Sequence, residues 1–177
     1  MIEMFIMGIA IDTRSGSPII ILNDQENRKA LPIWIGQAEA SAIIKILENI
    51  ETPRPMTHDL INSILDTVSC KIKKIEINDL NENTYYATIF LTDKNGKDYE
   101  IDSRPSDAIT LALKNRAPIF VTPNVVMDGT ISTDMERDQQ ESEDFKKFLN
   151  NIKPSDFKKL MKEDINLDEP GAEENDN

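Results

Sequence analysis

The feature that most limits how this chain can fold is an internal repeat of three strands followed by one helix. Apolar runs predict strands over 4–11, 18–22 and 28–35, and apolar residues at helical spacing predict a helix over 37–49. The same order recurs as strands over 71–77, 84–92 and 97–102, followed by a helix that begins near Arg104. The repeat predicts an α+β domain in which two such units form a curled, largely antiparallel sheet, or roll, with packed helices.

The second helix of the repeat lies in the stretch 100–121, which predicts a strand end, a turn, a helix and a return strand. Pro105 suits a first helical turn, because its φ is already fixed and it has no N–H to lose. Asp107 suits the positive end of the helix dipole, and Ser106 can accept a hydrogen bond from a helix N–H group. These preferences explain the turn but do not explain why Arg104 stands at its start.

A further helix is predicted between the two units, over 58–68. Thr57 is a suitable N-cap, and Asp59 occupies the acidic first turn. Arg54-Pro55 precedes this helix as Arg104-Pro105 precedes the other. Aligning the two units also matches Glu39 with Asp107, each followed by alanine.

The sequence divides into three parts. Residues 1–121, extending at most to about residue 135, form the predicted domain. Residues 122–162 are predicted to be a polar loop followed by short amphipathic C-terminal helices, which contain Phe145, Phe148, Phe157 and Leu160. Residues 163–177 contain seven acids and no base, which is typical of a disordered acidic tail.

The composition limits the partners and the compartment. The formal net charge is −12, so the chain lacks the overall basic surface of most nucleic-acid binders. Cys70 is the one cysteine, which excludes an internal disulfide and suits a cytoplasmic location. Glu3 interrupts the N-terminus and no long apolar run follows, so we expect neither a secretion leader nor a membrane span.

Polar side chains at the predicted helix starts are the candidates for chemistry, since no phosphate-binding loop, zinc motif or nucleophile elbow is found. Arg54 and Arg104 can clamp a phosphate, or else form ion pairs that fix a helix start. His58, the one histidine, can act as a general acid or base, or else be a semi-buried first-turn residue.

Three acids at helix starts add a possible metal site. Glu39, Asp59 and Asp107 would bind a divalent cation such as Mg²⁺ or Mn²⁺ if the two units face one another. The alternative is that each carboxylate only caps its own helix and needs no ligand. The sequence leaves both interpretations open.

Three segments in the right order resemble the bifunctional nuclease (BFN, or DUF151) family. They are LPIWIGQAEASAI over 31–43, PRPMTHDLI over 53–61, and SRPSDAITLAL with RAPIFV over 103–121. The resemblance covers about residues 1–121 and implies a compact α+β roll with an internally duplicated unit. The polar positions that recur in this family fall here on Glu39, Arg54, Thr57, His58, Asp59, Arg104, Ser106 and Asp107.

The resemblance implies a nuclease that acts on DNA and RNA, and two functional hypotheses follow. In the first, a divalent metal assists phosphodiester hydrolysis, with His58, Asp59, Asp107 and Glu39 as catalytic residues. Arg54, Arg104, Thr57 and Ser106 then bind the substrate, weakly because of the acidic balance. In the second, the same residues form a non-enzymatic module that binds an anionic ligand or a protein. A homo-oligomer with a site between subunits is a third possibility.

Overall fold

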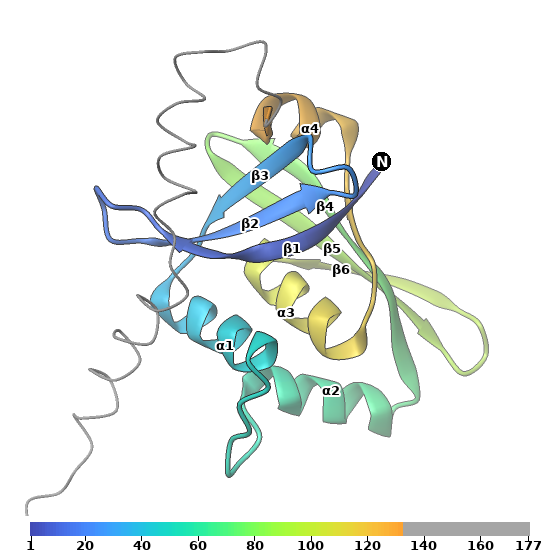
Figure 1. The fold of residues 1–177 in the computed structure, drawn as a ribbon. Coiled ribbons are helices and arrows are strands. Elements are labelled where there is room, and N and C mark those ends of the chain that lie inside the picture. The colour runs from blue at the N-terminus through green and yellow to red at the C-terminus, as the bar shows by residue number, and fades with distance from the viewer. Residues whose placement is uncertain (133–177) are drawn as a thin grey trace, which may run out of the picture. The chain divides into compact units, whose positions relative to one another are not determined.

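Two three-stranded meanders joined by one central strand form the sheet in the computed structural model, which describes residues 1–132 (Figure 1). The strands are β1 (Ile2–Ile11), β2 (Pro18–Asp24), β3 (Lys29–Trp34), β4 (Cys70–Asn81), β5 (Thr84–Asp93), β6 (Asp98–Ser103), β7 (Ile119–Val121) and the short β8 (Ile131–Ser132). Their order in the sheet is β6-β5-β4-β7-β1-β2-β3-β8, so the sheet is open at β6 and β8.

The pairing confirms a largely antiparallel sheet with one exception. Strands within each meander pair antiparallel, as do β1 with β7 and β3 with β8. The pair β4–β7 is parallel, because the chain leaves the second meander through a helix and returns along β4. The predicted duplication is therefore present, and β7 joins its two halves.

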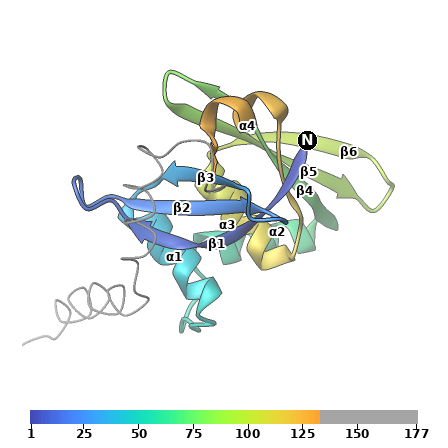
Figure 2. The same cartoon turned by 45° about the horizontal axis from the view of Figure 1, so that its top comes forward.

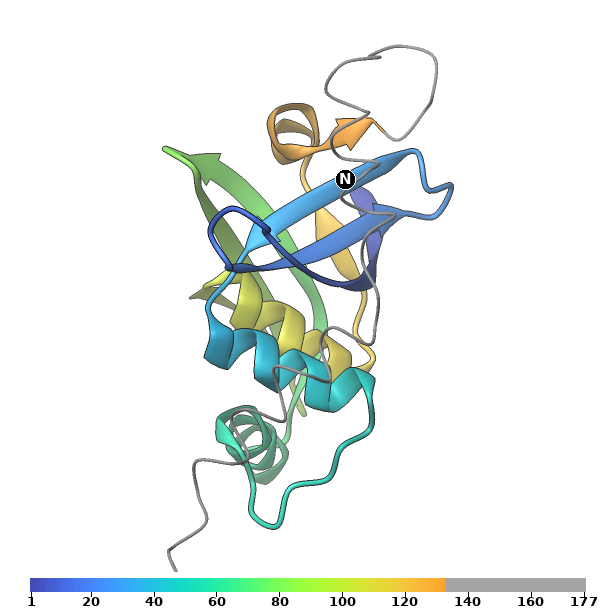
Figure 3. The same cartoon turned by 60° about the vertical axis from the view of Figure 1, so that its left-hand side comes forward.

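Four helices accompany the described sheet: α1 (Gln37–Leu47), α2 (Thr57–Thr67), α3 (Pro105–Asn115) and α4 (Pro123–Gly129). α1 and α3 lie side by side beneath the curled strands, and α2 lies on their far side (Figures 1 and 3). α3 is buried over most of its circumference, as its nearly continuous apolar sequence predicts. None of the helices within residues 1–132 is long and apolar enough to cross a membrane.

The core lies between the concave face of the sheet and α1 and α3. All seven residues of β2 are buried, so both faces of this strand are covered. The largest fully buried side chains include Ile20, Leu22, Leu31, Ile43, Ile75, Ile77, Ile109, Val121 and Val125. The core thus combines side chains from both repeat units, as a shared core requires.

The prediction of a polar loop from residue 122 is wrong for 123–129, which form α4. Pro123 occupies the first helical turn, and Val125 and Val126 are buried in the core. α4 lies across the strands from the other three helices in every view (Figures 1, 2 and 3). The domain therefore includes residues beyond 121. The helices predicted within 141–162 and the acidic tail over 163–177 lie outside the described residues.

The predicted cap of α2 is also wrong by one residue. Met56 is the N-cap, and Thr57 is the first helical residue. The Asp59 carboxylate, at the third helical position, reaches back and accepts the backbone N–H of Met56 at 2.8 Å.

Candidate functional site

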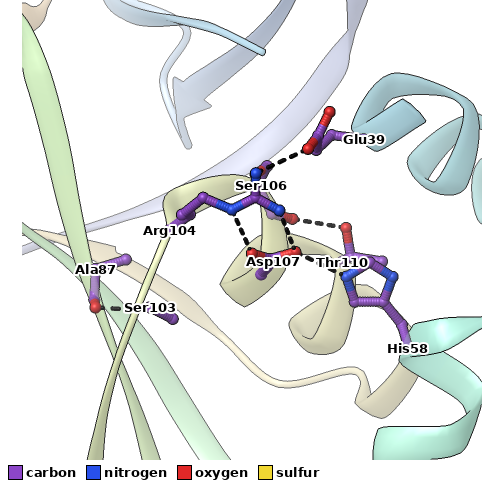
Figure 4. A network of polar contacts seen from close by, with 8 residues as sticks. All are labelled: Glu39, His58, Ala87, Ser103, Arg104, Ser106, Asp107 and Thr110. Atoms are coloured by element: carbon purple, nitrogen blue, oxygen red, sulfur yellow. Dashed lines mark hydrogen bonds and ion pairs between the residues drawn. The ribbon is translucent and has the colours of Figure 1, made fainter. Parts of the chain in front are cut away.

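Four charged or titratable side chains from three helices form one hydrogen-bonded chain (Figure 4). Arg104, the N-cap of α3, donates from Nε to Asp107 Oδ2 at 2.7 Å and from Nη2 to Asp107 Oδ1 at 3.2 Å. Its Nη1 donates to Glu39 Oε1 in α1 at 2.8 Å. The guanidinium therefore binds one carboxylate with two nitrogens and a second carboxylate with the third.

His58 completes this chain from α2. Its Nε2 lies 3.1 Å from Asp107 Oδ1, and the residue is only 9% exposed. An ionised Asp107 is acceptor-only, so Nε2 carries the proton in this contact. The contact fixes the tautomer, and it leaves Nδ1 as the lone-pair nitrogen of a neutral ring.

The electrostatics of the chain favour ionised partners. Burial raises the pKa of Asp107, but hydrogen bonds from Arg104 and His58 outweigh burial and hold that pKa below its usual value. The two carboxylates raise the pKa of Arg104, first because Asp107 accepts its hydrogen bonds and then because Glu39 accepts another. Asp107 is therefore an anion that orients His58 at neutral pH.

Asp59 does not join this chain. Its Oδ1 pairs with Lys114 Nζ of α3, and its Oδ2 caps the Met56 N–H. These two contacts, Lys114 first, hold the pKa of Asp59 below its usual value. Asp59 thus contacts Lys114 and the start of α2 rather than His58, its neighbour in the sequence, and its catalytic role stays a prediction.

The three predicted metal ligands do not converge. Glu39 and Asp107 meet only through the Arg104 guanidinium, which lies between them, and Asp59 is directed to Lys114. Across residues 1–132, no cluster of three or more acidic, histidine or cysteine side chains is placed to hold a metal ion. A divalent cation at these residues stays a prediction.

A groove of about 690 Å³ adjoins the chain of hydrogen bonds at His58. Four basic side chains line it: Lys45 at the end of α1, Arg54 in the loop before α2, Lys114 at the end of α3, and Arg116. Glu51 and Asp59 are the acids in its lining. Within an acidic protein, this groove is therefore locally cationic and has a histidine in its wall.

Arg54 and Arg116 are the two exposed arginines in the lining of the groove. Both are exposed, and no ion pair within residues 1–132 engages either guanidinium, whereas Lys114 is paired with Asp59. The sequence pattern at helix starts indicated Arg54 but gave no indication of Lys45, Lys114 or Arg116. Lysines in last helical turns complement the helix dipole, so their positions gave no separate signal for a site.

Thr57 and Ser106 occupy less direct positions. Thr57 is exposed on the first turn of α2 but is not part of the groove lining. Ser106 is buried in the first turn of α3, where its backbone carbonyl accepts the Thr110 hydroxyl at 2.6 Å (Figure 4). Roles for these two residues in substrate binding stay predictions.

Comparison with known proteins identifies relatives of this chain. A family model described as the bifunctional nuclease domain matches residues 20–134. An uncharacterised protein of Mycobacterium tuberculosis is 36% identical over 164 residues, covering 88% of this chain and 98% of its own length. Bifunctional nuclease 2 of Oryza sativa subsp. japonica is 29% identical over 118 residues, and Bifunctional nuclease 1 of Arabidopsis thaliana is 26% identical over 128. These two matches cover 64% and 66% of this chain, but only 36% and 39% of the plant proteins.

Proposed function

The chain belongs to the bifunctional nuclease family, and on that premise we propose that it is a nuclease that hydrolyses phosphodiester bonds in DNA and RNA. The observation that carries the proposal is the position of His58. It lies in the wall of the cationic groove and is oriented from behind by Asp107. An imidazole with a fixed tautomer beside a phosphate-binding groove is suited to proton transfer.

His58 acts as general base in this proposal. With the Nε2 proton held by Asp107, the Nδ1 lone pair accepts a proton from a water molecule as that water attacks the phosphorus. The same nitrogen, once protonated, can donate to a leaving oxygen. Asp107 stabilises the imidazolium that forms, and Arg104 fixes the Asp107 carboxylate in position.

The basic side chains of the groove supply the binding of the phosphate. Arg54 and Arg116 can donate to phosphate oxygens and neutralise the charge that develops during attack. Among the described residues that line the groove there is no phenylalanine, tyrosine or tryptophan, so these residues offer bases no stacking surface. We therefore expect backbone recognition, little base preference, and weak binding that salt disrupts.

Metal assistance is a separate part of the proposal. Glu39 and Asp107 carry the ligand type that Mg²⁺ or Mn²⁺ prefers, and a bound ion would supply Lewis-acid chemistry. With Arg104 between the two carboxylates, the residues as arranged do not fit a metal centre. In this proposal, proton transfer and phosphate binding for this reason belong to side chains alone.

The test is a cleavage assay on single- and double-stranded DNA and RNA, each with and without EDTA. We expect His58→Ala to lower the rate by about 10²–10⁴-fold, which is the usual contribution of general acid–base catalysis. The matched control is Lys71→Gln with Lys94→Gln, which alters two exposed lysines outside the groove. Cleavage by purified His58→Ala at the wild-type rate would refute the assignment, and loss of cleavage in EDTA would establish the metal requirement.

A non-enzymatic module that binds an anionic ligand or a protein is the second candidate. The observation in its favour is that Arg104 is fully engaged with two carboxylates, as in a purely structural ion-pair network. The open groove with uncommitted Arg54 and Arg116 favours ligand binding in either case. Binding of oligonucleotides without any cleavage, unchanged by His58→Ala, would support the module over the nuclease.

A further inference from the structure

α2 is attached to the domain mainly by polar contacts. Its inward side chains join α3 through three polar pairs: His58 with Asp107, Asp59 with Lys114, and Asn62 with Asn115. His58 is the only residue of the helix that is buried, and Ile61 adds a half-buried apolar contact. An amphipathic surface helix ordinarily turns its large apolar side chains toward the core, so α2 is oriented the other way.

Four large apolar side chains on α2 and its two caps face outward. They follow one another at four-residue spacing, with exposed fractions of 42% for Met56, 56% for Leu60, 53% for Ile64 and 57% for Val68. We call these four residues the α2 stripe. A continuous apolar stripe on a protein surface marks an interaction site, whereas single exposed apolar side chains do not.

We propose that the α2 stripe is a two-fold interface between two copies of this chain, in which the two α2 helices pack antiparallel. The stripe is symmetric about its midpoint, so an antiparallel copy places Leu60 opposite the partner's Ile64 and Met56 opposite the partner's Val68. Side chains at four-residue spacing form the ridges that interdigitate in the commonest class of helix packing. A two-fold interface requires a self-complementary surface of this kind.

The charges at the two ends of α2 favour a second copy in this orientation. Arg54 is exposed just before the helix, and Asp66 is exposed near its end. Antiparallel packing brings each Arg54 toward the partner's Asp66, and it places that carboxylate near the positive end of a helix dipole. Parallel packing would instead bring like charges together.

The composition of α2 disfavours a membrane as the occupant of the stripe. Helices that lie on anionic membranes are rich in lysine and arginine on their polar face. Residues 57–67 contain two aspartates and neither lysine nor arginine. The stripe therefore fits an apolar protein surface, such as another copy of itself, better than an anionic lipid surface.

The interface borders the groove that contains His58. Met56 belongs to the stripe and also lines the groove, as does Ile50, which is 42% exposed. In the dimer, the end of the partner's α2 lies beside Met56, so each groove gains part of its wall from the second copy. This consequence adds to the proposed function, and the interface itself does not rest on it.

Analytical ultracentrifugation of the full-length protein tests the interface. We expect a monomer–dimer equilibrium at micromolar concentrations. Ile64→Glu should raise the dimer Kd at least about tenfold, because each interface then buries two unpaired carboxylates. Met127→Glu is the matched control, since Met127 is 80% exposed on α4. A wild type that stays monomeric, or a dimer whose Kd is the same in Ile64→Glu, overturns the proposal.

Disulfide trapping tests the antiparallel orientation. In a Cys70→Ser background, we expect a mixture of Leu60→Cys chains and Ile64→Cys chains to form disulfide-linked heterodimers, because these positions face one another across the two-fold axis. Met56→Cys alone should not cross-link, since the two copies of residue 56 lie about 18 Å apart along antiparallel helices. Cross-linking of Met56→Cys as efficient as that of the mixture, or none in the mixture, overturns the proposal. Neither measurement uses nucleic acid, so the interface and the proposed function fail separately.

Discussion

Asp107 accepts hydrogen bonds from two side chains on different elements, so its ionisation is linked to folding. Its pKa is held below the usual value in the folded protein by Arg104 and His58. A carboxylate with a lowered pKa stabilises the fold fully above its unfolded pKa of about 3.9, and this contribution is lost as the pH falls through the lower folded pKa.

We therefore expect Asp107→Asn to lower the melting temperature at pH 7, and the difference from wild type to shrink below about pH 4. Thermal unfolding followed at pH 7, 5, 4 and 3 measures this. Asp128→Asn, at an exposed acid, is the control and is expected to change little. A difference between wild type and Asp107→Asn that persists at pH 3 would mean that the carboxylate charge is not its source.

The structure joins four of the residues that were selected from the sequence and separates a fifth, and helix geometry explains the difference. The repeat and the helix starts selected Glu39, His58, Arg104 and Asp107, and the structure joins these four. Asp59 was selected by the same rule and is directed to Lys114 instead. Adjacent helical residues point about 100° apart, so sequence adjacency to His58 did not place Asp59 in the same network.

At the scale of elements, the groove gathers the ends of α1 and α3 and the loop before α2. We expect Arg54→Gln with Arg116→Gln to weaken binding of single-stranded oligonucleotides. Each lost phosphate contact reduces the slope of log K against log salt by about 0.7, so the double variant should reduce it by about 1.4. Fluorescence anisotropy across a salt series measures the slope.

The control for the groove is the pair Lys71→Gln with Lys94→Gln, which removes the same charge from another surface. Its slope should stay close to that of wild type. Equal loss of slope in both pairs would indicate a general charge effect rather than binding in the groove.

α4 is too short for its sequence periodicity to predict a helix. Its seven residues contain two buried valines in a polar context, too few to establish a helical period. We expect Val125→Ala to lower the free energy of unfolding by about 2 kcal/mol, because a fully buried valine loses two methyl groups to a cavity. Urea denaturation measures the change, and Met127→Ala, at 80% exposure on the same helix, is the control. Equal effects of the two substitutions would exclude α4 from the core.

At the scale of the whole molecule, the duplicated order of elements predicted the two meanders and their shared core. It did not predict that β7 lies in the centre, parallel to β4 and antiparallel to β1. Three residues long, β7 has too little sequence to specify its partners, and its place is decided by where α3 returns the chain. Long-range pairing of this kind depends on the packing of α3 against β4 and β5 rather than on local sequence.

The charge of the whole chain leads to the last prediction. Residues 163–177 contribute seven acids and no base, so their removal changes the formal net charge from −12 to −5. Self-charge of the same sign as a polyanion slows its approach and weakens binding over distances of about one Debye length, roughly 10 Å at 0.1 M salt. We therefore expect deletion of 163–177 to tighten oligonucleotide binding at low ionic strength, with the gain disappearing as salt is raised.

A full-length variant with the seven acids replaced by their amides should behave as the deletion does, because the effect depends on charge and not on chain length. Equal oligonucleotide affinity of wild type, the deletion and the amide variant at low salt would show that the charge of residues 163–177 does not affect binding.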